Sequence, residues 1–225
     1  VYSLMRTEKG DIKAYISNPN VNLALNGDGK LDVRAVVGTE GTLTVIKDLG
    51  MKEPFTGQVS LVSGELGEDF TYYMANSEQI PSAIGLSVLV DTDDSIKAAG
   101  GFMIQVMPDA SDEAITKVEQ NIAAIPLVSR LMENGETPEQ ILARILGEEN
   151  VEVLETMPVR FHCDCSRERF AGGLSSIGKA ELHEMIVEDH GAEVVCHFCG
   201  EKYHYSEADL QELVTAIDEK RAANI

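Results

Sequence analysis

Two short motifs govern how this sequence is organised: Cys163-Asp164-Cys165 and, after thirty intervening residues, Cys196-His197-Phe198-Cys199. The chain has four cysteines in all, and its first 162 residues contain none. Four thiolates in two close pairs bind Zn²⁺ tetrahedrally, and Gly200 after the second pair lets the backbone turn tightly around a metal. We therefore predict one Zn²⁺ ion bound by Cys163, Cys165, Cys196 and Cys199.

Spacing alone leaves other uses of the cysteines open. Four inert thiols are one alternative, and a thioredoxin-like enzyme is another. Redox catalysis needs Cys-x-x-Cys at a helix N-terminus, however, whereas residues 202–205 predict a strand after Gly200. The neighbouring histidines are expected to lie around the site without binding the metal, since four cysteines complete the coordination; they are His162, His197 and His204. The spacing by itself favours a purely structural site over a redox switch.

Oxidation of such a site has a predictable physical effect. If each close pair formed a disulfide, the bond would close only a tiny loop and would restrain the unfolded chain little. Loss of zinc, in contrast, removes a binding free energy that reaches about 10–16 kcal/mol in small zinc peptides. Local oxidation is therefore expected to unfold the cysteine-containing domain.

The fold class that we predict is α+β, in three parts. Residues 1–110 are β-rich and form a core domain, residues 111–150 form a helical linker, and residues 151–225 form a small zinc domain. A domain of about 70 residues is near the size at which a metal or disulfides are commonly needed for stability.

Local patterns predict the individual elements. Strands are expected at 12–16, 42–46, 70–74, 102–107 and 202–205, and glycine-rich turns at 26–29, 38–41 and 100–101. A helix is expected over 77–90, and another over 111–132 with a break or kink at Pro126.

Two later helices have clearer signals. One begins with Thr137 as the N-cap, Pro138 at the first helical position and Gln140 completing a capping box, and it ends at Gly147. The last helix begins near Ser206 and has one apolar face; this face consists of Leu210, Leu213, Val214 and Ile217.

Composition excludes several classes of protein. Lys and Arg number 18 against 38 Asp and Glu, giving a net charge of −20, which argues against nucleic acid or an anionic membrane as the main partner. A hydrophobic content of 44% suits a globular chain and is too high for a disordered one. No stretch approaches the ~18 apolar residues of a membrane span. Charged residues among the first ten do not fit a secretory signal, so we expect a cytoplasmic protein.

The cysteine motifs, preceded by Met157-Pro158-Val159-Arg160-Phe161, resemble the redox domain of the 33 kDa chaperonin family, the redox-regulated heat-shock holdases. Segments of the N-terminal part agree with that family; they are residues 29–34, 37–39, 47–50, 63–70 and 98–102. The resemblance spans nearly the whole chain.

The resemblance implies a chaperone and not an enzyme. The reduced, zinc-bound form would be inactive. Oxidation would form Cys163–Cys165 and Cys196–Cys199 disulfides and expel the metal, and the zinc domain and linker would lose structure. The protein would then dimerise and hold unfolding client proteins without ATP under heat or oxidative stress, with the core domain serving substrate binding and dimerisation. The resemblance thus favours a switch over a structural site.

The family name implies about 33 kDa, whereas this chain has 24.5 kDa, so we expect a fragment lacking the N-terminal part of the core domain. The main alternative function is a constitutive structural zinc module of a larger assembly, and a thiol oxidoreductase is a third. Candidate client contacts are the apolar faces of the linker helices, although packing against the β domain is their ordinary role; the residues are Ile115, Val118, Ile122, Ile141, Leu142 and Ile145.

Overall fold

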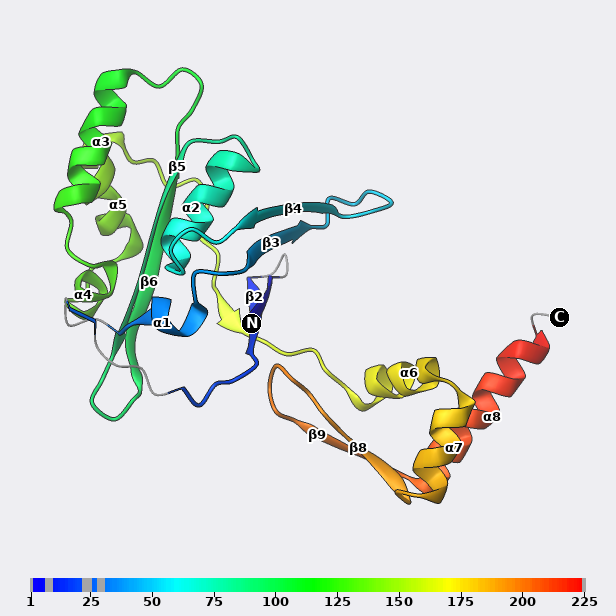
Figure 1. Ribbon diagram of the computed structural model, residues 1–225. Helices are drawn as coiled ribbons and strands as arrows, with labels where there is room; N and C mark the ends of the chain where they lie inside the picture. The colour runs from blue at the N-terminus through cyan, green and yellow to red at the C-terminus, as the bar shows by residue number, and fades with distance from the viewer. Residues whose placement is uncertain (1, 7–9, 22–25, 28–30, 224–225) are drawn as a thin grey trace. The chain divides into compact units, whose positions relative to one another are not determined.

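The computed structural model describes residues 2–6, 10–21, 26–27 and 31–223, and it forms two compact units (Figure 1). Unit 1 comprises residues 1–19 and 157–225, and unit 2 comprises residues 20–156. Each unit contains both helices and strands, which confirms the α+β class. This division differs from the expected one because the first 19 residues belong with the cysteine-containing segment. The functional roles assigned to 1–110, 111–150 and 151–225 stay predictions.

Unit 2 is built from two antiparallel hairpins and the helices packed on them. Its strands are β3 (Thr42–Lys47) with β4 (Phe55–Ser60), and β5 (Ser82–Val90) with β6 (Ile96–Gln105). Its helices are α1 (Val33–Val37), α2 (Leu66–Asn76), α3 (Asp112–Ala124), α4 (Val128–Glu133), α5 (Pro138–Leu146) and the short 3₁₀ helix η1 (Glu148–Asn150). Within this unit, α2 lies on one side of the β5–β6 hairpin and α3 to α5 lie on the other (Figure 1).

The core of unit 2 joins the linker helices to β6. Residues alternate along β6, so Phe102 and Ile104 face the helices while Met103 is 56% exposed. Gly100 lies on the inner face, where a Cβ would overlap Met132 of α4, so the missing side chain lets that helix approach the strand. The buried centre of the cluster is formed by Val128, Leu131, Ile141 and Ile145.

Three local predictions in unit 2 are wrong. The β-prone run 70–74 lies inside helix α2, because tertiary contacts override local propensity there. Tyr73 is 1% exposed and donates its hydroxyl to Glu78 at 2.5 Å, and Asp69 at the start of the helix accepts backbone hydrogen bonds from Val62 and Ser63.

The predicted helix over 77–90 is instead strand β5, which pairs with β6 from Ser82↔Gln105 to Val90↔Ile96. The turn expected at 100–101 is also wrong, since both glycines lie within β6. The turn expected at 26–29 and the similarity at 29–34 include residues 28–30, which lie outside the described residues.

The remaining local predictions are confirmed. Helix α3 ends at Ala124 and α4 begins at Val128, so the predicted helix is interrupted around Pro126. Thr137 and Gln140 form both hydrogen bonds of the capping box, at 2.9 and 3.3 Å. The strands expected at 12–16, 42–46, 102–107 and 202–205 overlap observed strands.

Unit 1 combines a small mixed sheet, a hairpin and three helices. Strand β2 (Asp11–Ile16) pairs antiparallel with β1 (Tyr2–Arg6) and parallel with β7 (Arg160–Phe161). Strands β8 (Gly191–Val195) and β9 (Lys202–Ser206) form the hairpin. The helices are α6 (Arg167–Ile177), α7 (Lys179–Val187) and α8 (Glu207–Ala223).

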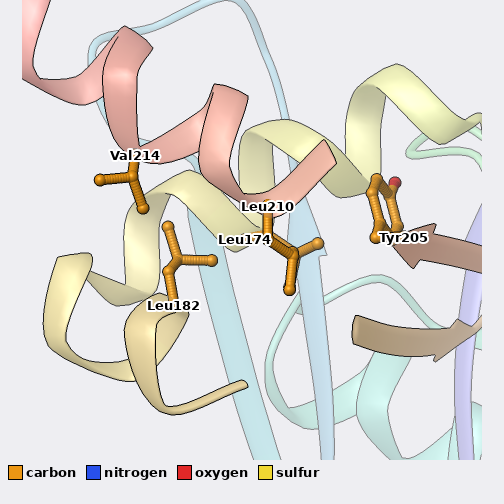
Figure 2. Close-up of a cluster of buried hydrophobic side chains, with 5 residues drawn as sticks. All are labelled: Leu174, Leu182, Tyr205, Leu210 and Val214. Carbon is orange, nitrogen blue, oxygen red and sulfur yellow. The ribbon is translucent and has the colours of Figure 1, made fainter. Parts of the chain in front are cut away.

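The helices of unit 1 and strand β9 enclose a small apolar cluster, shown in Figure 2. Its buried members are Leu174, Leu182, Tyr205, Leu210 and Val214. Leu213 and Ile217 pack against the cluster, which confirms the predicted apolar face of the last helix. No helix in the described ranges is long and apolar enough to cross a membrane.

Candidate metal centre

The first cysteine motif lies between strand β7 and helix α6. Ser166, directly after Cys165, caps that helix by accepting a hydrogen bond from the Arg169 backbone N–H at 3.3 Å. The cap marks the end of the extended segment, so Cys163 and Cys165 lie directly before the N-terminus of α6.

The second motif forms the turn between β8 and β9. The Cys196 N–H donates to the Glu201 carbonyl, and the Gly200 N–H donates to the Cys196 carbonyl, both at 2.8 Å. Gly200 has φ of +75°, a left-handed conformation that glycine adopts without strain. The motif is therefore a hairpin knuckle, as the sequence predicted, and it does not lie at the helix N-terminus that a thioredoxin-like enzyme needs.

The two motifs bring all four sulfur atoms together. The four Sγ atoms lie within 4.8 Å of one another. Cys163 Sγ is 3.6 Å from Cys196 Sγ, and Cys165 Sγ is 3.4 Å from Cys199 Sγ. A tetrahedral metal with metal–sulfur bonds near 2.3 Å separates its sulfurs by about 3.8 Å. The residues therefore fit a tetrahedral metal ion with four sulfur ligands.

Exposure and acidity differ among these thiols. Cys196 is 3% exposed, whereas Cys199 is exposed. Burial opposes ionisation of Cys196, but hydrogen bonds from the backbone N–H groups of Cys199 and Phe198 and from neighbouring thiols outweigh it and lower its pKa to about 7. The Glu201 backbone N–H favours the Cys199 thiolate, but the surrounding thiols outweigh it and raise the Cys199 pKa to about 12. A bound metal would deprotonate all four outright.

No histidine joins the four cysteines in any candidate metal cluster of the described residues. The His197 ring contacts Tyr15 edge-on, with ring centroids 5.0 Å apart. His204 is exposed beside Glu193, with an Nε2–Oε2 distance of 3.5 Å. The expectation that histidines surround the site without binding the metal stays a prediction.

Comparison with known proteins places the chain in a family. A family model described as Hsp33 protein matches residues 3–206. The 33 kDa chaperonin of Enterococcus faecalis is 64% identical over 205 residues, which are 91% of this chain and 69% of that protein. The chain belongs to the Hsp33 family. The resemblance noted in the sequence is therefore confirmed.

Other Hsp33 relatives agree in sequence and in fold. The 33 kDa chaperonin of Bacillus subtilis is 57% identical over 205 residues, covering 91% of this chain and 70% of that protein. The crystal structure of the Thermotoga maritima 33 kDa chaperonin matches with a TM-score of 0.85 at 38% identity, covering 97% of this chain and 78% of that one. The similarity thus includes both compact units.

The linker residues predicted to contact clients are packed in this Hsp33 structure. Ile141 and Ile145 are buried, at 4% and 0% exposed, and Val118 and Ile122 pack against the same cluster. Ile115 and Leu142 are half-buried. The Ile141 and Ile145 side chains are therefore covered as long as the helices stay in the cluster.

Sequence reasoning missed the residues around the sulfurs. Lys13 forms an ion pair with Asp164, between the first two cysteines, and Tyr203 Oη lies 3.2 Å from Cys165 Sγ. The Tyr203 contact could have been found, because alternate residues of the predicted strand 202–205 face the same way. No local pattern links Lys13 to a motif 151 residues away.

Proposed function

We propose that this chain is a redox-regulated molecular chaperone that binds unfolding proteins without ATP and prevents their aggregation. The observation that carries the proposal is the cluster of four cysteine sulfurs, from two motifs, in a member of the Hsp33 family. Such a site senses oxidants because thiolates are the form of cysteine that peroxide attacks. The chain is accordingly a stress-response chaperone and not an enzyme.

The metal in the reduced protein is Zn²⁺, one per chain, bound by Cys163, Cys165, Cys196 and Cys199. Four thiolates are the ligand set typical of structural zinc, and the sulfur separations fit its tetrahedral geometry. When bound, zinc holds the four sulfurs as thiolates and links the two motifs. The reducing cytoplasm is the compartment in which this form persists.

Oxidation begins at Cys199, because it is the exposed member of its pair whereas Cys196 is buried. The Cys199 thiolate attacks one oxygen of hydrogen peroxide, giving a sulfenic acid and, after protonation, water. Cys196 then attacks that sulfenic sulfur, forming the Cys196–Cys199 disulfide and releasing a second water. Cys163 and Cys165 consume a second peroxide in the same way, so two peroxides are reduced for two disulfides.

Loss of the metal removes the link between the two motifs, and both short disulfides leave long stretches of unit 1 unrestrained. We propose that the linker helices then leave their cluster and that Ile115, Val118, Ile122, Ile141, Leu142 and Ile145 become client contacts. The active form is a homodimer. Neither nucleic acid nor a membrane is a partner, in keeping with the net charge of −20.

The test is to treat the reduced, zinc-loaded chain with peroxide at elevated temperature. Zinc release is followed with a chromogenic chelator, and aggregation of an unfolding client is followed by light scattering. We expect about one zinc per chain to be released and the client to be protected only after release. The matched control is the same zinc-loaded chain kept with a thiol reductant at the same temperature, because neither disulfide can form there while all four zinc ligands stay in place. Release without client protection would favour a constitutive structural zinc module, and insulin-reduction turnover would indicate an oxidoreductase.

A further inference from the structure

Strand β2 directs one of its faces toward both cysteine motifs. Side chains alternate along a strand, so Asp11, Lys13 and Tyr15 share a face. Asp11 and Lys13 are buried, at 7% and 9% exposed, and Tyr15 is half-buried, whereas Ala14 and Ile16 on the other face are exposed. We call Asp11, Lys13 and Tyr15 the inner face of β2.

The inner face contacts the segment before the first motif, the first motif itself and the second motif. Asp11 Oδ1 accepts a hydrogen bond from Arg160 Nε at 2.7 Å. Lys13 forms an ion pair with Asp164, the residue between Cys163 and Cys165. The Lys13 Nζ also lies 5.2 Å from the ring centroid of Phe198, between Cys196 and Cys199, within the range of a cation–π contact.

Tyr15 and the backbone add two further links. The Tyr15 ring meets the His197 ring at 84°, an edge-to-face arrangement that aromatic pairs prefer. The His162 N–H, directly before the first motif, donates to the Ile12 carbonyl at 3.1 Å. One strand from the start of the chain therefore bridges the two motifs that supply the sulfurs.

We propose that the inner face of β2 is a clasp that positions the two cysteine motifs against each other and thereby sets how readily the metal is released. The proposal rests on the proposed function only in taking the metal to be zinc and its release to be the trigger. Lys13 is the central residue of the clasp, because its Nζ contacts a residue of each motif, Asp164 in the first and Phe198 in the second. Four thiolates around Zn²⁺ carry a net charge of −2, so the cation beside Asp164 also offsets repulsion between that carboxylate and the sulfurs.

The clasp predicts faster metal release when Lys13 loses its charge. Lys13→Met keeps the apolar stem and removes both the ion pair and the cation–π contact. We expect about a fivefold faster release of zinc, the size typical of losing a partly exposed ion pair. Tyr15→Leu is expected to accelerate release by about threefold, since it removes one aromatic pair. Lys13→Arg keeps the charge and should restore a rate close to wild type.

Zinc release is measured in two arms, with peroxide and with a competing chelator under reducing conditions. Lys179→Met is the matched control, because Lys179 also forms an ion pair in unit 1, with Asp218, but it lies between helices α7 and α8. It should lower the melting temperature without changing the release rate. Amide hydrogen exchange in α8 checks that each variant is folded. If Lys13→Met does not fold, the release rate of Tyr15→Leu tests the proposal instead.

The outcomes separate the clasp from the proposed function. Wild-type release rates for both Lys13→Met and Tyr15→Leu in the chelator arm would overturn the clasp. If Lys179→Met accelerated zinc release as much as Lys13→Met does, the clasp would also be overturned, because the release rate would then depend on the general stability of unit 1. A wild-type chain that holds its zinc in peroxide would contradict the proposed function alone, since the chelator arm tests the clasp without an oxidant.

Discussion

Replacing Ile145 with alanine should make the reduced protein partly active. Ile145 is 0% exposed at the centre of the cluster that holds the linker helices, beside Ile141 of the same helix. Removing three carbon groups at about 0.8 kcal/mol each, together with the cavity left behind, predicts a loss of about 3–4 kcal/mol. If the helices dock as a unit, a loss of about 3 kcal/mol increases the undocked population roughly 100-fold.

The assay compares the reduced, zinc-loaded wild type and Ile145→Ala by light scattering of an aggregating client over a temperature series. We expect the variant to protect the client at lower temperature and without oxidant. Limited proteolysis of residues 111–150 reports whether the linker has left its cluster. Ile96→Ala is the matched control, because Ile96 lies in strand β6 of the same unit but is 69% exposed, so its loss should change stability by less than about 0.5 kcal/mol. A linker that is cleaved readily in Ile145→Ala without any client protection would refute the reasoning.

Three further predictions concern unit 1. Ser206→Ala removes the hydroxyl that accepts from the Asp209 backbone N–H at 3.3 Å, so it should lower the free energy of unfolding by about 1 kcal/mol, measured in urea on the zinc-loaded protein. Gly200→Ala places a residue with a Cβ at φ of +75°, which strains the backbone, so it should weaken zinc binding in a chelator competition. Gly172→Ala should leave zinc binding unchanged, because a Cβ at that position has no atom within 4 Å. Chelation of the metal under reducing conditions should increase amide exchange in the β8–β9 turn before exchange in β5–β6, and uniform exchange in both would contradict the link between metal and local order.

The sequence predicted the clustering of the four cysteines better than it predicted the elements of unit 2. The cysteine motifs can be recognised in the sequence because metal coordination requires particular residue types at short spacing. Gly200 indicates the turn, because glycine adopts a positive φ without strain. The capping box at Thr137 is likewise local, since its two hydrogen bonds involve residues three apart.

Residues 70–90 show where local reasoning fails. The run 70–74 has strand-forming residues, yet it is helical because Tyr73 is buried and Asp69 anchors the first turn. Small and larger apolar side chains alternate only over residues 83–88, and pairing with β6 determines that the whole segment 82–90 is extended. Propensity is a weak prior when packing of this kind outweighs it.

By itself, the sequence predicted the clustering of the four cysteines, the α+β class and the family, because each depends on residue identity over short distances or over the whole chain. Tertiary structure alone decided that residues 1–19 belong with the cysteines, and that Lys13 and Tyr15 reach the two motifs. The physical reason is that strand pairing and side-chain contacts form between segments far apart in the chain, and no local pattern encodes which distant segment will supply the partner.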